Sequence, residues 1–173
     1  MAEEQYIYLG LGSNMHDRYQ NLKKGIKLLN DHPHIWVTEH SHVYQSPPMY
    51  NVDQEDFYNM VIKLETNLTP LDLLGVIKSV EVEVGRQKER RRNMPRIVDI
   101  DILAFGDLQI HSNLLEIPHP KILDRKFVLK PWNDIDPDFL VPNYSAKVSE
   151  LLENTEDNSD IRMVLIFDKE EMI

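Results

Sequence analysis

Two carboxylates inside an otherwise apolar run constrain the fold of this chain more than any other feature. Residues 97–105 are all apolar except Asp99 and Asp101. In a β-strand, residues i and i+2 share one face and lie about 6–7 Å apart along it. Both carboxylates therefore leave the same face of a strand that we expect to be buried. Two like charges there are costly unless a positive group neutralises them, so we expect arginines or divalent cations beside this strand.

A basic segment directly precedes the strand. Between Arg86 and Arg96 the chain has six basic residues and one acidic residue, Glu89. Arginine binds phosphoryl oxygens bidentately, and Mg²⁺ prefers carboxylate oxygens. Two Mg²⁺ ions between the aspartates and a polyphosphate, with arginines around them, would suffice for phosphoryl transfer. A solvated charge run or a chance Asp-x-Asp explains either feature alone, but their proximity favours the functional interpretation.

Length and charge exclude several classes of protein. The 173 residues are close to the usual size of one domain, so we expect a single domain over residues 1–173, with a polar, acidic, exposed segment at about 149–160. The chain has no cysteine and no secretory leader pattern, so we expect a cytoplasmic protein without thiolate metal sites. A net charge of −10 argues against a sequence-independent hold on nucleic acid or on an anionic membrane.

The spacing of apolar residues predicts strands and helices in the order β-α-β-β-α-β. The predicted strands are 6–11, 35–44, 57–64 and 98–105, and the predicted helices are 17–30 and 70–84. Thr69, Pro70 and Gly85 have the positions of an N-cap, a first helical residue and a C-terminal cap. Further along the chain, we expect 108–110 to return as a hairpin arm and 125–132 to form a short helix or a turn.

This order suits an α+β fold: a ferredoxin-like βαββαβ sandwich in which helices pack on one antiparallel sheet. Two connections, 46–56 and 85–97, are then long loops. Loops of about a dozen residues without structure of their own are usually functional. We therefore expect both loops at an active site.

Seven short motifs occur in an order and spacing that are typical of one enzyme family. They are Leu11-Gly12-Ser13-Asn14, Gln45-Ser46-Pro47-Pro48, Phe57-Tyr58-Asn59, Glu81 through Gly85-Arg86, Pro95 through Leu103, Ile117-Pro118-His119-Pro120 and Arg125-Lys126-Phe127. The most specific is the block at 95–103, with the pattern Pro-Arg-x-x-Asp-x-Asp-Ile-Leu. By these motifs the chain resembles the 6-hydroxymethyl-7,8-dihydropterin pyrophosphokinases (HPPKs) over about residues 6–142.

The resemblance implies an activity and its partners. Enzymes of this family transfer a pyrophosphoryl group from ATP to the hydroxymethyl group of the dihydropterin, with AMP as leaving group, as a step toward folate. ATP and 6-hydroxymethyl-7,8-dihydropterin would then be the partners, together with two Mg²⁺ ions, and we expect no nucleic acid and no membrane. We expect a monomer and leave a dimer open.

The resemblance also implies roles for individual residues. Asp99 and Asp101 would bind the two Mg²⁺ ions, and Arg86 and Arg96 would be the catalytic arginines. The residues implied around ATP are Glu81, Lys88, Arg96, Ile102, His119 and Arg125. The residues implied around the pterin are Ser46, Pro47, Met49, Phe57, Asn59 and Phe127. An amide and aromatic rings suit the edge and the faces of a flat heterocycle.

The chain departs from the family pattern in its basic segment. Asn93-Met94 stands where the family usually has Trp-Gly, whose tryptophan helps to close a loop over ATP and pterin. Lys88 stands where arginine is frequent, and lysine holds phosphate without the bidentate fork. We therefore expect the activity to be retained, with altered affinity and loop closure.

Taken without the resemblance, several features keep plainer explanations. Phe57 and Phe127 are equally well explained as core residues, and His119 as a turn residue. The stretch 10–14 lacks the lysine and the spacing of a P-loop, so a turn with a helix cap is preferred over a phosphate cradle. Two other functions stay open: another Mg²⁺-dependent nucleotide phosphotransferase, and a non-enzymatic RNA-binding module that uses the arginines.

Overall fold

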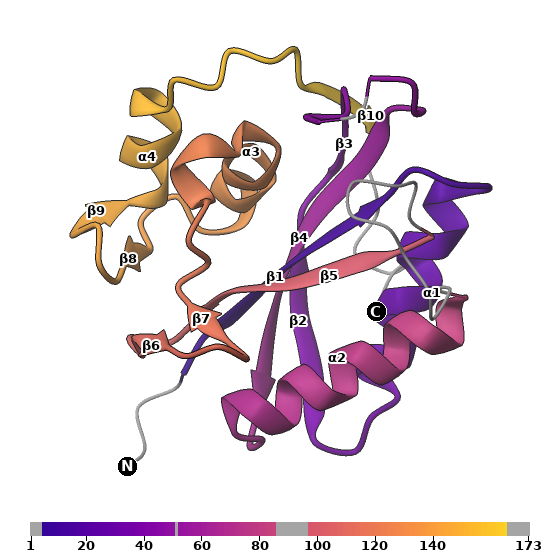
Figure 1. Cartoon of the computed structure of the whole chain (residues 1–173). Coiled ribbons are helices and arrows are strands. Elements are labelled where there is room, and N and C mark those ends of the chain that lie inside the picture. Colours follow the sequence, from indigo (N-terminus) through magenta and orange to yellow (C-terminus); the bar gives the residue numbers. More distant parts are fainter. Residues whose placement is uncertain (1–4, 51, 86–96, 166–173) are drawn as a thin grey trace.

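A six-stranded antiparallel sheet forms the centre of the molecule (Figure 1). The computed structural model describes residues 5–50, 52–85 and 97–165. Along the sheet the strand order is β10-β3-β4-β1-β5, and β2 pairs with the other part of the long strand β4. The strands are β1 (Ile7–Ser13), β2 (Ile35–His40), β3 (Val43–Ser46), β4 (Phe57–Thr66), β5 (Asp99–Phe105) and β10 (Arg162–Leu165).

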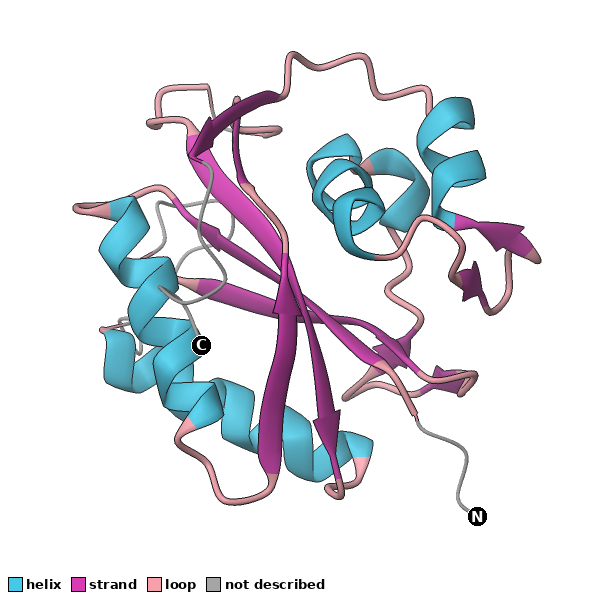
Figure 2. Ribbon diagram, turned by 180° about the vertical axis from the view of Figure 1, so that it is seen from behind, coloured by secondary structure: helices cyan, strands magenta, loops and turns pink. Residues whose placement is uncertain are grey.

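Two helices cover one face of this sheet, α1 (Arg18–Asn30) and α2 (Pro70–Val84) (Figure 2). Helix α1 begins where the Asp17 carboxylate accepts a hydrogen bond from Gln20 N, and α2 begins where Thr69 accepts one from Asp72 N. Helix α2 ends at Gly85, whose φ of 125° is readily adopted only by glycine. The predicted cap residues of α2 are confirmed.

Two further helices lie on the opposite face, α3 (Lys126–Ile135) and α4 (Val148–Asn154). Because side chains alternate across a strand, β1 serves both faces: Leu9 packs toward α1 and α2, and Tyr8 packs against Trp132 of α3. Outside the sheet lie a short 3₁₀ helix, η1 (Ile122–Asp124), and two small hairpins, made by β6 (Ile110–His111) with β7 (Glu116–Ile117) and by β8 (Leu140–Val141) with β9 (Ala146–Lys147). The α+β class with an antiparallel sheet is confirmed.

The predicted strand 35–44 is wrong in one respect, because it is two strands. Ser41 interrupts it: Ser41 N donates to Val61 O, and Ser41 Oγ accepts from Val61 N at 2.9 Å. The hydroxyl takes the place of a main-chain carbonyl in the ladder, so the pairing register with β4 shifts between β2 and β3.

The segment 149–160 also differs from its prediction. Its first part belongs to α4, and Leu151 is 5 % exposed in the core cluster beneath α3 and α4. Apolar residues at 148 and 151 share one face of that helix, which explains why a segment of acidic composition is partly buried. Among the described residues, no helix has the length and apolar character needed to cross a bilayer.

Candidate active site

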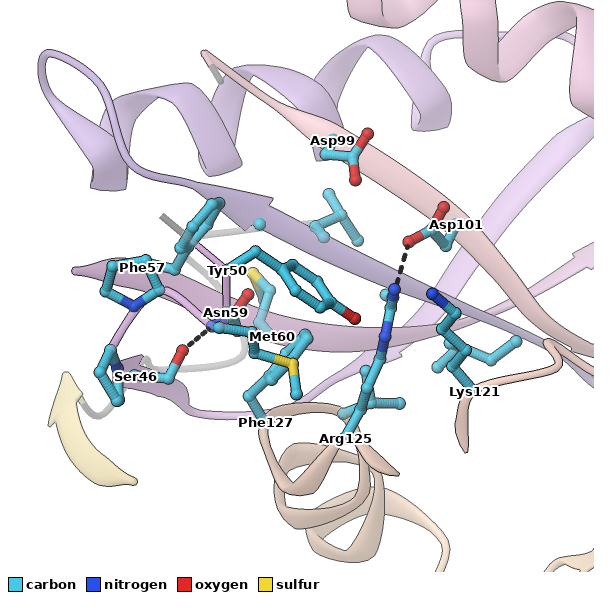
Figure 3. A pocket seen from close by; sticks show the side chains of 18 of the residues that line it. Ser46, Tyr50, Phe57, Asn59, Met60, Asp99, Asp101, Lys121, Arg125 and Phe127 are labelled. Atoms are coloured by element: carbon cyan, nitrogen blue, oxygen red, sulfur yellow. Dashed lines mark hydrogen bonds and ion pairs between the residues drawn. The ribbon is translucent and has the colours of Figure 1, made fainter. Parts of the chain in front are cut away.

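A pocket opens on the sheet face that carries α3 (Figure 3). Nine of the residues implied by the resemblance line it together: Ser46, Pro47, Met49, Phe57, Asn59, Asp99, Asp101, Arg125 and Phe127. They come from β3, β4, β5, the start of α3 and the loops that adjoin them. The structure therefore gathers residues that are up to 81 positions apart in the sequence, from Ser46 to Phe127.

The register of the sheet sets the order of the groups in the pocket. Gly12 of β1 lies opposite Asn59 on one side and opposite Asp99 on the other, and Gly10 lies opposite Asp101. Neither glycine has a side chain, so the floor between the amide and the carboxylates stays open. The preferred interpretation of residues 10–14 as a turn with a helix cap is wrong: residues 10–13 belong to β1, and Asp17 caps α1.

One end of the pocket presents an amide and aromatic rings. Asn59 is buried, and its Nδ2 donates to Ser46 Oγ at 2.6 Å. Phe57 and Phe127 come from β4 and α3 and both line the pocket. The bond to Ser46 orients the amide, so this end can recognise the edge of a flat ring while the aromatic side chains pack against the ring.

The other end of the pocket is charged. Asp99 and Asp101 leave the same face of β5, and the Asp101 side chain is 37 % exposed. Arg125 Nη1 lies 3.7 Å from Asp101 Oδ2, and the Arg125 guanidinium carbon lies 5.6 Å from the Phe127 ring centroid. Both carboxylates thus face the pocket beside a guanidinium, and their hard oxygen atoms are the ligands that Mg²⁺ prefers.

Glu81 and Ile102 are not brought to the pocket. The Glu81 side chain is fully buried under β5, where Oε1 accepts a hydrogen bond from Ile100 N at 2.9 Å and Oε2 lies 3.5 Å from Lys78 Nζ. Ile102 packs into the core cluster beneath α1 and α2, on the other face of β5 from the aspartates. Neither residue lines the pocket, and their roles around ATP stay predictions. Glu81 instead supports the main chain between Asp99 and Asp101.

His119 lies next to the pocket without lining it. Its main-chain N donates to Leu103 O at 3.0 Å, and its Nδ1 accepts from Lys121 N at 3.2 Å. Burial, followed by the positive charge of Arg125, lowers the pKa of His119 to about 4. At neutral pH the ring is therefore uncharged, and the bond to Nδ1 leaves the proton on Nε2. Such a ring can donate one hydrogen bond without adding charge.

Tyr50 and Lys121 are among the lining residues that the sequence analysis missed. The Lys121 ammonium lies 5.7 Å from the centroid of the Tyr50 ring, so the two loops that carry them approach each other across the pocket. Figure 3 shows the Tyr50 ring lying over the interior between Asn59 and Arg125. An aromatic residue directly after Met49 and a lysine two positions after His119 were the available signals.

Three predicted residues lie outside the described part of the chain: Arg86, Lys88 and Arg96. The same holds for Asn93-Met94. Their roles stay predictions.

These features define the class of protein: an α+β protein whose pocket has an aromatic and amide end and a charged end. A sequence model of the family described as 7,8-dihydro-6-hydroxymethylpterin-pyrophosphokinase (HPPK) matches residues 8–137. The 2-amino-4-hydroxy-6-hydroxymethyldihydropteridine pyrophosphokinase of Bacillus subtilis is 39% identical over 128 residues, which cover 74% of this chain and 76% of that protein. The chain belongs to the HPPK family.

Other relatives are longer proteins. The chain is 39% identical to the folic acid synthesis protein FOL1 of Dictyostelium discoideum over 94% of its own length but only 24% of that protein. It is 42% identical to the bifunctional protein FolKE of Lactococcus lactis over 86% of its own length and 42% of that protein. It thus spans less than half of these two relatives.

Solved structures of low sequence identity share the fold. The Plasmodium falciparum HPPK-DHPS triple mutant, solved with STZ-DHP, superposes with a TM-score of 0.69 at 17% identity, over 87% of this chain and 43% of that one. At this identity the likeness supports the fold alone.

Proposed function

We propose that this protein transfers the pyrophosphoryl group of ATP to the hydroxymethyl group of 6-hydroxymethyl-7,8-dihydropterin. The hydroxyl oxygen bonds to the β-phosphorus and loses its proton to water, the bond from that phosphorus to the α,β-bridging oxygen breaks, and AMP leaves. One observation carries the proposal: in a chain of this family, a single pocket joins an aromatic and amide end to the carboxylates of Asp99 and Asp101. Both substrates would then bind on one face of the sheet.

The amide end would bind and orient the pterin. Asn59 Nδ2 donates to Ser46 Oγ, so the amide plane is set before a ligand arrives. Phe57 and Phe127 would pack against the ring, while Pro47 and Met49 would complete the wall. This arrangement would point the hydroxymethyl group of a bound pterin along the floor at Gly12, toward β5.

The charged end would bind ATP with two Mg²⁺ ions held by Asp99 and Asp101. These two carboxylates suit Mg²⁺ because their hard oxygen atoms leave one face of β5 and are open to the pocket. The Arg125 guanidinium already lies beside Asp101. Bound Mg²⁺ would neutralise phosphate charge and make the β-phosphorus more electrophilic. Arg125 and His119 would bind phosphate oxygens by donating hydrogen bonds, and Arg86 and Arg96 would stabilise charge that develops in transfer.

The remaining expectations are part of the proposal. A ferredoxin-like scaffold is supported by the strand order β5-β1-β4, with β2 and β3 along the far side of β4 and two helices on one face. We also propose one domain over residues 1–173, a monomer, a cytoplasmic location and no nucleic-acid or membrane partner. The net charge of −10 argues against nucleic acid and anionic membranes as partners.

The first prediction tests the activity. The purified protein with Mg²⁺, ATP and 6-hydroxymethyl-7,8-dihydropterin should release AMP and form the pterin diphosphate, both measured by chromatography. Asp99→Ala and Asp101→Ala should each lower turnover by at least about a hundredfold, because losing one transition-state charge contact costs about that much. Asp107→Ala, a carboxylate just beyond β5, is the matched control.

Two results would contradict this proposal. No AMP from the wild-type protein, while the Bacillus subtilis relative produces it under the same conditions, would remove the activity. Turnover of Asp99→Ala and Asp101→Ala within a few-fold of wild type would remove both residues as metal ligands. Circular dichroism spectra of the variants show whether they are folded.

A further inference from the structure

Helix α3 lacks a local cap at the end that enters the pocket. Arg125 occupies the N-cap position, and no side chain near it in sequence caps the helix. The first helical amide, Lys126 N, instead donates to Asp157 Oδ2 at 2.9 Å, from a residue 31 positions later. Both neighbours of Lys126, Arg125 and Phe127, line the pocket. A distant carboxylate thus holds the turn that presents two site residues.

The same short segment makes two more bonds to this turn. Thr155 Oγ1 donates to Leu123 O, and Lys126 Nζ donates to Ser159 O at 3.2 Å. Asp157 is itself oriented by Ser159, whose Oγ and N donate to Asp157 Oδ1 at 2.6 and 3.0 Å. The contacts at 123 and 126 lie on both sides of Arg125, so the segment restrains the main chain of that residue from two sides.

Beyond residue 160 the segment reaches the other wall of the pocket. Strand β10 pairs with β3 through Arg162 opposite Gln45 and Met163 opposite Tyr44. Strand β3 ends at Ser46, the residue that orients the Asn59 amide. Figure 1 shows this part of the chain leaving α4 and ending beside β3. The family match stops at residue 137, so the segment lies outside it.

We propose that residues 155–165, the C-terminal strap, position the pterin-binding wall, and that the Asp157 contact with Lys126 N places Phe127 and Arg125 in the pocket. This inference rests on the proposed function, because it assigns Phe127 to the pterin. The body of α3 does not need the strap: Tyr44 Oη donates to Asp134 Oδ2 at 2.7 Å, and Leu129 and Trp132 are fully buried. Loss of Asp157 should therefore loosen the first turn and leave the helix docked.

Asp157→Ala tests the strap, with Glu156→Ala as matched control, because residue 156 is an exposed carboxylate one position away. Losing a helix cap should weaken pterin binding about fivefold, measured by calorimetry. Asp157→Asn keeps one acceptor oxygen, which can serve Lys126 N only if the bond from Ser159 N is given up, so it should restore part of the affinity. In a Phe127→Ala background, Asp157→Ala should have no further effect, because the side chain that it positions is gone.

Hydrogen exchange of the protein without ligand gives a readout that does not depend on the activity. Amides at 126–129 should exchange faster in Asp157→Ala than in Glu156→Ala, while those at 132–135 stay protected. Wild-type pterin affinity in Asp157→Ala, or an equal loss in the Phe127→Ala background, would overturn the positioning role. A wild-type protein that binds no pterin would instead overturn the proposed function.

Discussion

At the scale of single residues, one missing Cβ shapes the pocket. A methyl group on Gly12 would lie 2.8 Å from Asn59 Oδ1, closer than non-bonded heavy atoms approach. The position is a glycine because the Asn59 amide lies against it, and not because the chain turns there: Gly12 is inside β1. Gly12 belongs to one of the family motifs, but the contact that requires a glycine there comes from Asn59, on a strand almost 50 residues away.

Gly12→Ala should displace the Asn59 amide and break its bond to Ser46. Overpacking of this kind costs about 1–3 kcal/mol, so pterin affinity should fall by about tenfold or more in calorimetry. Gly75→Ala is the matched control, since a Cβ there meets nothing within 4 Å and alanine favours the helix. Unchanged affinity in Gly12→Ala would remove Asn59 from pterin recognition.

His119 should make stability depend on acid pH. Its pKa is lowered from 6.5 to about 4, first by burial and then by Arg125. Between these values the unfolded chain binds a proton that the folded chain does not, so the free energy of unfolding falls as pH drops from about 6.5 to 4, by about 1–3 kcal/mol. His119→Asn, which keeps an acceptor for Lys121 N, should flatten this slope in urea titrations.

Exposed His34 provides the control for this measurement. His34→Asn should keep the wild-type dependence of unfolding free energy on pH. Equal slopes for the wild type and His119→Asn would show that His119 does not carry the effect.

At the scale of elements, α2 supports the strand that carries the aspartates. β5 is the last strand of the sheet order, and Glu81 of α2 accepts the hydrogen bond from Ile100 N. Ile100 lies between Asp99 and Asp101, so this contact holds the main chain at the point from which both carboxylates leave. The buried Glu81 carboxylate thus supplies the hydrogen-bond acceptor that a neighbouring strand would otherwise supply to Ile100 N.

Glu81→Ala should leave Ile100 N without this acceptor and lower the free energy of unfolding by about 1–3 kcal/mol in urea titrations. The affinity for Mg²⁺-ATP should fall with it, because the aspartates lose their support. Glu81→Gln keeps an oxygen at this place and should be milder. Glu83→Ala, exposed on the same helix, should behave as wild type. Unchanged stability and nucleotide affinity in Glu81→Ala would contradict this role.

Elements that depend on local chemistry were predictable, and those that depend on remote contacts were not. Helix α2 carries its own caps, Thr69 and Gly85, so its ends were predicted correctly. The break after β2 depends on Ser41 bonding to Val61 of another strand. The orientation of Glu81 had a local signal, because it lies four positions after Ile77 on the apolar face. That spacing predicts burial of Glu81 under β5.

At the scale of the whole molecule, net charge and charge placement give different information. The total of −10 argues against nucleic acid and anionic membranes as partners and does not locate a site. The placement of the charges does locate a candidate site, because Asp99 and Asp101 line the same pocket as Arg125 and Lys121. The nine pocket residues could be assembled in advance only through the resemblance, because spacing along the chain does not reveal which loop faces which strand.

The long reach of the C-terminal strap has a consequence for how the molecule assembles. Arg162 pairs with Gln45, so more than a hundred residues are synthesised between the two partners. Contacts of such high sequence separation form slowly, because a large loop must close before they can contribute. A growing chain can pair β1 with β4 and dock α1 and α2 long before residues 155–165 have left the ribosome. We therefore expect the core to fold first and the walls of the pocket to be completed last.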